Sequence, residues 1–256
     1  MLKWLDLTNY LGLPEAASAH SAEIDAMMGL VHWLMLVMFL IWAPFFVYTL
    51  YRFRASRNPK ADYYGTKSHF STYHEVGVIV AELVLLFAFA IPTWATLRAE
   101  DNYPSEEEST VVHVIAEQFA WNIHYPGPDG VFGQRDVHLV DLLTNPIGLQ
   151  PDDPAAADDI VTVNELHVPV NKPVIVHLTS KDVIHSFTLT EMRVKQDAIP
   201  GLSIPLYFTP IRTGDWEIAC AQLCGLGHYR MRGYFTVHTA EGYAAWLAEQ
   251  SERAGV

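Results

Sequence analysis

The sequence predicts a membrane-anchored α+β protein, with a two-helix transmembrane hairpin, an all-β sandwich or barrel and a C-terminal helix. Three observations lead to this fold class: two long apolar runs in the first hundred residues, short β-type runs after residue 109, and a stretch, CAQLCGLGHYRM, that holds both cysteines. The 256-residue chain is 50% hydrophobic with a formal net charge of −13, which argues against disorder and nucleic-acid binding and suits cationic partners.

Residues 1–27 are mixed in polarity and weakly amphipathic. They lack the basic-then-apolar order of a cleaved signal peptide, because a single Lys is followed by polar and acidic residues. We expect a surface helix or an extended tail here.

Residues 28–97 are predicted to form the transmembrane hairpin. Its spans cover about 28–51, which is uncharged, and about 76–97, which is interrupted only by Glu82. Each is long enough to cross a hydrocarbon core of about 30 Å. A pair of buried helices in a soluble protein is the weaker explanation, because soluble helices are seldom apolar on every face. Pro44 and Pro92 are expected to kink these helices.

The loop between the spans sets the predicted orientation. It carries five basic residues against one acid, Asp62 (Arg52, Arg54, Arg57, Lys60 and Lys67). Because basic loops stay on the cytoplasmic side, both termini are predicted to lie outside. From Arg98 onward the chain has ten Lys and Arg against 22 Asp and Glu, a net charge of −12 on the outer side.

Two carboxylates belong to the second span or its edge. Glu75 lies beside His74 at the cytoplasmic mouth, where a helix-start carboxylate is ordinary. Glu82 lies about two turns deeper, where an isolated charge would be costly. Glu82 therefore needs a partner or a proton, and both a neutral hydrogen-bonded acid and a role in proton movement remain open.

Residues 98–240 are predicted to form the β domain. Runs such as TVVHVIAEQFAWNIHY, PVIVHLTS and GYFTVHT are rich in branched and aromatic residues and are separated by turn sequences such as PGPDG. The stretch 144–159 is expected to be a polar surface loop. Residues 241–256 are predicted to form a closing helix, with Thr239 as a possible cap.

The cysteine-containing stretch indicates a metal-binding loop. Cys220 and Cys224 are followed at short spacing by His228 and Met231, and thiolate, imidazole and thioether together select copper. Two bridging thiolates could hold two copper ions. A disulfide is the first alternative, although so short a loop gains little from it, and zinc is the second, although zinc would not need a thioether.

One more imidazole is then required from elsewhere. His185, in KDVIHSFTL, lies at a predicted strand end from which a side chain can face a neighbouring loop. His138, His167 and His177 lie inside alternating runs, where a solvated or hydrogen-bonded side chain is the default. His185 is therefore the candidate.

The hairpin, DVIHSF, VKQDAIPG and C-x-x-x-C-G-x-x-H-x-x-M together resemble subunit II of the haem–copper oxidases. The likeness covers about residues 28–240. It implies a cupredoxin domain carrying the dinuclear copper centre CuA, with the backbone carbonyl of Gln222 as one ligand. The side-chain ligands that the resemblance implies are His185, Cys220, Cys224, His228 and Met231.

The chain departs from the family pattern at two places. Gln222 stands where Glu is commonest, which puts the magnesium ion at the junction with the catalytic subunit in doubt. Phe119 stands where the Trp thought to receive the donor's electron would be, so electrons are expected to arrive through Phe119, Trp121 or another path. Both aromatics could instead simply pack the barrel. Glu75 aligns with the carboxylate at the entrance of a proton channel into the catalytic subunit.

The resemblance implies an electron-accepting subunit of a respiratory cytochrome c oxidase. Electrons would pass from cytochrome c, or a cytochrome c domain of another complex, through two copper ions to haem in subunit I. That subunit would hold the haems and a further copper and reduce oxygen, with proton pumping. Subunit III and membrane lipid are further expected partners, and the expected location is the bacterial inner membrane, with both termini and the copper domain on the periplasmic side.

Three alternatives have distinct signatures. A copper-free quinol oxidase subunit should lack the ligand set, and a nitrous oxide reductase module should lack the two spans and have a large catalytic domain. A membrane-tethered copper carrier would release copper to chelators. The sequence contains no C-x-x-C-H motif, so a fused cytochrome c domain is not expected.

Overall fold

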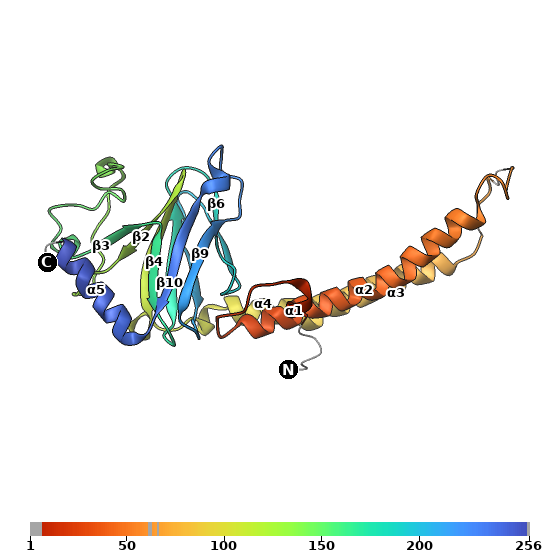
Figure 1. Cartoon of the computed structure of the whole chain (residues 1–256), viewed down its shortest axis with the longest axis horizontal. Coiled ribbons are helices and arrows are strands. Elements are labelled where there is room, and N and C mark those ends of the chain that lie inside the picture. Colours follow the sequence, from red (N-terminus) through yellow and green to blue (C-terminus); the bar gives the residue numbers. More distant parts are fainter. Residues whose placement is uncertain (1–6, 61–62, 66, 255–256) are drawn as a thin grey trace. The chain divides into compact units, whose positions relative to one another are not determined.

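The structure, a computed structural model, describes residues 7–60, 63–65 and 67–254. The chain divides into two compact units. One is helical and comprises, among the described residues, 7–13 and 22–102. The other is the β unit, which comprises Pro14–Ser21 and residues 103–254 (Figure 1).

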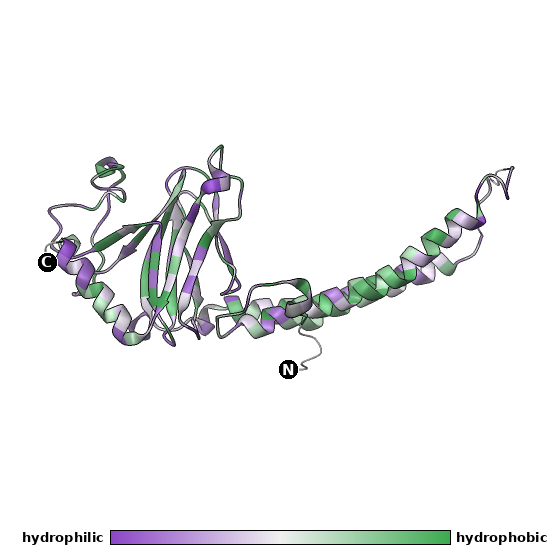
Figure 2. Cartoon of the chain, in the orientation of Figure 1, coloured by the Kyte–Doolittle hydropathy of each residue, from purple (hydrophilic) through white to green (hydrophobic). Residues whose placement is uncertain are grey.

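The helical unit contains the two predicted spans. After the short α1 (Thr8–Leu11), α2 runs over Ser21–Arg52, and a second helix runs from Phe70 to Arg98 as α3 (Phe70–Leu85), η2 (Leu86–Ala90) and α4 (Ile91–Arg98). Both long helices are long and apolar enough to cross a membrane. Figure 2 shows hydrophobic residues along both, and none of the most apolar stretch is buried within the chain. This surface requires lipid or protein around it.

The helices begin earlier than the predicted spans, at Ser21 rather than residue 28 and at Phe70 rather than residue 76. Polar residues can continue a helix beyond the hydrocarbon core, which hydropathy alone does not reveal. Pro44 lies inside the unbroken α2, whereas Pro92 follows the π-helical turn η2. Because proline has no N–H, a wider turn just before it accommodates the missing helical hydrogen bond.

The β unit is a sandwich of two five-stranded sheets, as the sequence predicted. Their strand orders are β3-β2-β1-β5-β8 and β4-β10-β9-β6-β7. The pairs β1–β5 and β4–β10 are parallel and the other pairs are antiparallel. The strands are β1 (Thr110–Glu117), β2 (Ala120–Tyr125), β3 (Ile160–Val163), β4 (Glu165–Pro169), β5 (Val174–Ser180), β6 (His185–Leu189), β7 (Val194–Ala198), β8 (Ile204–Phe208), β9 (Gly214–Cys220) and β10 (Arg232–His238).

The core lies between the sheets. Alternate residues of β1 and β5 are fully buried there, as the two-residue period of a strand requires (Val112, Val114, Val176 and Leu178). Trp121 of β2 and Phe187 of β6 meet inside with ring centroids 5.5 Å apart. The first strand begins at Thr110, and Tyr103 already belongs to the β unit.

The segment Pro14–Ser21 is part of the β unit and is neither a free tail nor a surface helix. The N–H of Ala17 donates to the Glu191 carbonyl at 2.8 Å, and its carbonyl accepts from Ile211 N–H at 2.9 Å. The Ser18 hydroxyl donates to the Met192 carbonyl at 2.7 Å. Ala17 and Ser18 are buried, so a segment far away in the sequence completes this unit.

The closing helix is α5 (Ala240–Ala254). The Thr239 hydroxyl accepts a hydrogen bond from Gly242 N–H at 3.1 Å, which confirms the predicted cap. Trp246 of α5 stacks on His167 of β4 with centroids 4.4 Å apart and meets Tyr125 edge-on at 5.1 Å. The helix thus packs through aromatic rings against the sandwich.

Candidate metal centre

The cysteine-containing loop connects two neighbouring strands. Cys220 is the last residue of β9, and Met231 immediately precedes β10. The two strands are antiparallel, and Cys220 N–H donates to the Met231 carbonyl at 3.3 Å. The short η7 (His228–Arg230) then turns the chain back. The sheet therefore fixes both ends of the loop and brings its ligand-type side chains together.

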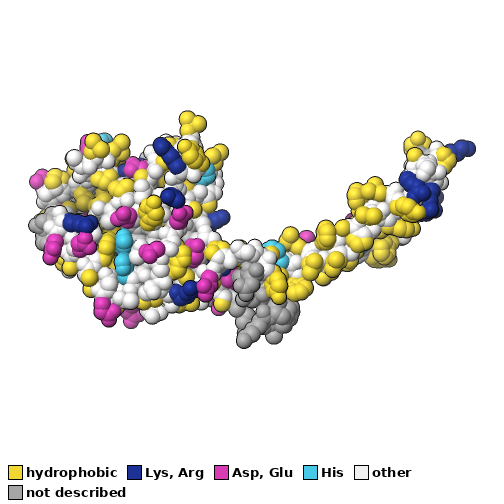
Figure 3. Space-filling view, in the orientation of Figure 1, with side chains coloured by type: hydrophobic (Ala, Val, Ile, Leu, Met, Phe, Trp, Pro, Cys, Tyr) yellow, Lys and Arg dark blue, Asp and Glu magenta, His cyan; other side chains and the backbone are white. Residues whose placement is uncertain are grey.

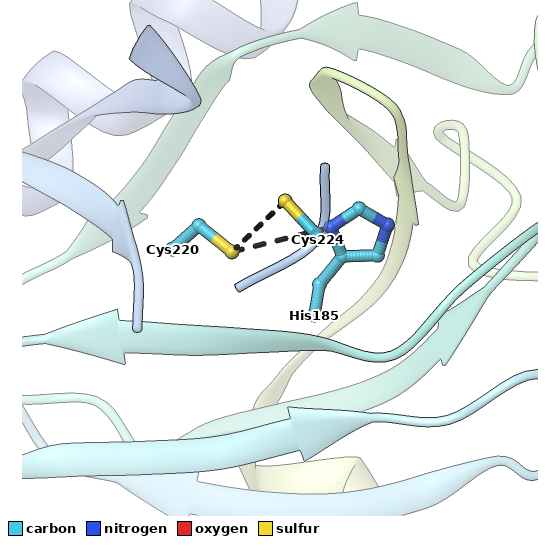
Figure 4. Close-up of side chains that lie close together, drawn as sticks. All are labelled: His185, Cys220 and Cys224. Atoms are coloured by element: carbon cyan, nitrogen blue, oxygen red, sulfur yellow. Dashed lines mark hydrogen bonds between the residues drawn. The ribbon is translucent and has the colours of Figure 1, made fainter. Parts of the chain in front are cut away.

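His185 reaches the loop from the next strand. It is the first residue of β6, which pairs with β9 so that Phe187 lies opposite Cys220. Its side chain is fully buried, and its Nδ1 lies 4.0 Å from the Cys220 sulfur. Figure 4 shows the side chains of His185, Cys220 and Cys224 converging. The two sulfur atoms are 3.8 Å apart.

The other predicted ligands join the same cluster. His228 Nδ1 lies 3.5 Å from the Cys224 sulfur, and the Met231 sulfur lies 3.7 Å from Cys224 and 3.1 Å from His185 Nδ1. The backbone carbonyl of Gln222 lies 3.2 Å from the Cys220 sulfur. The structure thus brings together every residue that the sequence singled out for copper.

The donor set fits copper better than the alternatives. Both cysteines are free thiols, which leaves them available as ligands rather than tied in a disulfide. A closed zinc site would use four ligands from Cys and His, whereas here a buried thioether, that of Met231, faces the same cluster. Thiolate and thioether sulfur with imidazole is the ligand combination that soft copper ions prefer.

The environment of the Cys224 sulfur opposes loss of its proton when no cation is close by. Burial, together with the neighbouring Cys220 thiol, raises the pKa of Cys224 to about 11. A thiolate at neutral pH therefore needs a compensating cation, and a metal that binds must displace a proton.

Asp182 orients the buried imidazole, a role that the sequence analysis missed. Its Oδ1 lies 2.9 Å from His185 Nε2, so the carboxylate accepts a hydrogen bond from the Nε2–H group and Nδ1 is left free for a metal. Burial opposes ionisation of Asp182, but hydrogen bonds from His185 and from the Gln118 and Val183 N–H groups lower its pKa overall. Its place three residues before the ligand, in DVIHSF, was the available signal.

The two aromatic candidates differ in position. Phe119 is partly buried and packs on the loop so closely that a Cβ on Gly227 would lie 2.4 Å from its ring. Trp121 is fully buried in the core, with its ring 6.2 Å from that of His185. The preceding Gln118 donates from Nε2 to the Cys224 carbonyl at 2.6 Å.

The two carboxylates of the second span lie on α3 of the helical unit. Glu75 and Glu82 are both exposed on the isolated chain. Neither has an ion pair within the described part of the chain, 7–60, 63–65 and 67–254.

Comparison with known proteins identifies relatives. Residues 110–235 match the family model for the cytochrome c oxidase subunit II periplasmic domain. The chain is 34% identical to an alternative cytochrome c oxidase subunit 2 of Bradyrhizobium diazoefficiens, covering 91% of this chain and 82% of that protein. It is 29% identical to cytochrome c oxidase subunit 2 of Cereibacter sphaeroides, covering 93% and 79%. The crystal structure of the periplasmic domain of subunit II of cytochrome oxidase from Bradyrhizobium japonicum aligns with a TM-score of 0.44 at 24% identity, covering 59% and 97%.

Proposed function

The chain belongs to the cytochrome c oxidase subunit II family, and we propose that it is the subunit through which electrons reach the oxidase, by way of a dinuclear copper centre. One observation carries the proposal: two thiols, two imidazoles, a thioether and a backbone carbonyl converge in one loop and the adjoining strand. A copper-free subunit would have no reason to keep this set.

The ligands divide naturally between two ions. Cys220 and Cys224 lie centrally and would bridge, while His185 lies nearer Met231 and His228 lies beside Cys224 as terminal donors. When bound, two copper ions held by these donors would share one unpaired electron in the oxidised state, so an added electron would change their bonds little. The chain's part is to hold the donors still: His185 through Asp182, and Cys220 and Met231 through the β9–β10 pair.

Phe119 is the better candidate for receiving electrons from a donor. Trp121 is fully buried behind His185 and has no surface that a docking protein could touch. Phe119 is partly exposed and packs on the metal loop. The net charge of −12 from Arg98 onward would attract a basic cytochrome c or cytochrome c domain, at a rate that falls with added salt.

The outer side of the metal loop is suited to contact with subunit I. Three apolar side chains next to the ligands are strongly exposed, Leu223 at 77%, Leu226 at 97% and Tyr229 at 86%. A partner over this surface would place its haem near the copper centre. Gln222 offers an amide rather than a carboxylate at this junction, so we expect no magnesium ion of the usual kind there.

The helical unit would anchor the subunit in the bacterial inner membrane. Lys and Arg gather at the loop end of the hairpin (Figure 3), and because basic loops stay on the cytoplasmic side, this supports a cytoplasmic loop and a periplasmic copper domain. Glu75 would then lie at the entrance of a proton path into subunit I. Oxygen reduction at the haems and copper of subunit I, proton pumping, and contact with subunit III belong to the same proposal.

Electron paramagnetic resonance of the copper-loaded, air-oxidised full chain in detergent tests the proposal. We expect hyperfine structure from one electron shared by two equivalent copper nuclei, and two copper ions per chain by elemental analysis. Cys224→Ser should abolish the shared signal, whereas Leu223→Ser, next to it but outside the ligand set, should leave it unchanged. A single-copper spectrum from the unmodified chain would overturn the electron-accepting role.

A further inference from the structure

Three histidines form a row across the outer face of the β3-β2-β1-β5-β8 sheet. His113 of β1 lies directly opposite His124 of β2 and His177 of β5 in the strand register. The residues on either side of His113, Val112 and Val114, are fully buried in the sandwich. Successive strand residues point to opposite faces, so His113 and His177 both point away from the core.

His124 is already committed within this row. Its Nε2 lies 2.6 Å from Asp159 Oδ2, and both side chains are fully buried. Asp159 Oδ2 also accepts from Gly133 N–H at 2.8 Å, which ties the long β2–β3 connection to the sheet. His124 therefore has a structural partner and is not available to an external ligand.

His113 and His177 are not committed in this way. Phe132 stacks on His113 with centroids 3.9 Å apart and holds the ring in place, while His113 Nδ1 is buried and unpartnered among the described residues. The His177 side chain is 27% exposed, and its Nε2 lies 3.5 Å from Oε1 of the exposed Glu106.

The spacing of the two rings suits one shared ion. Zinc–nitrogen bonds of about 2.0–2.1 Å in tetrahedral geometry place two bound imidazole centres roughly 5.2 Å apart. The centroids of His113 and His177 are 5.3 Å apart. Glu106 and His177 are exposed enough to turn toward such an ion, whereas His113 is already fixed.

We propose that His113, His177 and Glu106 form a second metal site, separate from the cysteine loop, for a borderline divalent cation such as Zn²⁺ or Cu²⁺. Two imidazoles and one carboxylate are ligands of this class, and water would complete the coordination. Burial, with Arg135 nearby, lowers the pKa of His113 to about 3, so its ring is in the neutral form that binds metals. Arg135 also interacts with Asp159, which offsets its charge.

Zinc titration of the full chain in detergent, followed by calorimetry, tests this site. We expect two binding events, because Zn²⁺ also binds thiolates. Cys220→Ser combined with Cys224→Ser should remove one event, and His177→Gln or Glu106→Gln should weaken the other at least tenfold. His177 and Glu106 are exposed, so these variants should fold, and circular dichroism verifies this.

His138→Gln is the matched control, because His138 is exposed on the β2–β3 connection and lies outside the proposed site. It should leave both events unchanged. The proposal is overturned if the His177→Gln titration superimposes on that of the unmodified chain, or if the double cysteine variant binds no zinc. Neither result depends on whether the loop holds copper in the working protein.

Discussion

Replacing Gly227 by Ala tests the contact between Phe119 and the cysteine-containing loop between β9 and β10. Gly227 has φ −91° and ψ 4°, which alanine can adopt, so the backbone itself adds no strain. The new Cβ would lie 2.4 to 2.7 Å from three atoms of the Phe119 ring, closer than such atoms approach. Overpacking of this kind costs about 1–3 kcal/mol, against a gain of about 0.4–1 kcal/mol from the stiffer unfolded chain.

The sign of the effect should depend on Phe119. In the unmodified chain we expect Gly227→Ala to lower the free energy of unfolding by up to about 2.6 kcal/mol. In a Phe119→Ala background the same change meets no ring and should stabilise by roughly 0.4–1 kcal/mol. Chemical denaturation of the four proteins gives the coupling energy, with any effect of Phe119→Ala alone cancelled by the cycle.

Gly242→Ala in α5 is the matched control. The atoms nearest to its Cβ would be the Thr239 hydroxyl at 3.3 Å and atoms of His238, so it should show no coupling with Phe119. Equal effects of Gly227→Ala in both backgrounds would refute the close packing of the ring on the loop. They would also remove the structural reason for treating Phe119, rather than Trp121, as the aromatic next to the ligands.

Three further outcomes follow from the same structure. Asp182→Asn should weaken copper binding by about 10- to 100-fold in chelator competition, because the His185 ring loses the carboxylate that orients it. Asp197→Asn, the same substitution on β7, should leave copper binding unchanged. Burial and His238 lower the pKa of His167 to about 4 in the folded chain. The neutral ring therefore stabilises the fold above pH 6.5, and this contribution is lost as the pH falls from 6.5 toward 4. In a plot of melting temperature against pH, His167→Gln should make the decrease on the acid side less steep. A β-domain fragment beginning at residue 99 should melt at a lower temperature than one with Pro14–Ser21 fused to it, and equal melting temperatures would contradict the part given to Ala17 and Ser18.

The convergence of the ligand-type side chains in the cysteine-containing loop could be predicted because most of them are close in sequence. Cys220, Cys224, His228 and Met231 lie within twelve positions, and only His185 had to be sought elsewhere. It was found because a strand end can face a loop, and β6 does pair with β9. The hairpin and sandwich were predicted for a similar reason, since hydrophobic periodicity is read within each element.

What the sequence did not predict depends on contacts between distant segments. Nothing in Pro14–Ser21 indicates that Ala17 would bond to Glu191 and Ile211, because the polarity of the segment is ordinary for a tail. Trp121 and Phe119 are two residues apart, yet one is fully buried and the other packs on the loop. Their difference is set by which sheet face and which loop cover them.

The histidines show the limit most clearly. An alternating strand pattern leaves each of them solvated or hydrogen-bonded by default, which is all that His167 and His177 offered in sequence. In the structure His167 bonds to His238 at 2.8 Å, His124 to Asp159, and His177 approaches Glu106. Whether an imidazole serves as a ligand, as a buried hydrogen-bonding group or as a packing ring depends on its neighbours, and these depend on the strand register. His185 differs from the others because the atoms beside its Nδ1 are the sulfurs of Cys220 and Met231, at the two ends of the cysteine-containing loop.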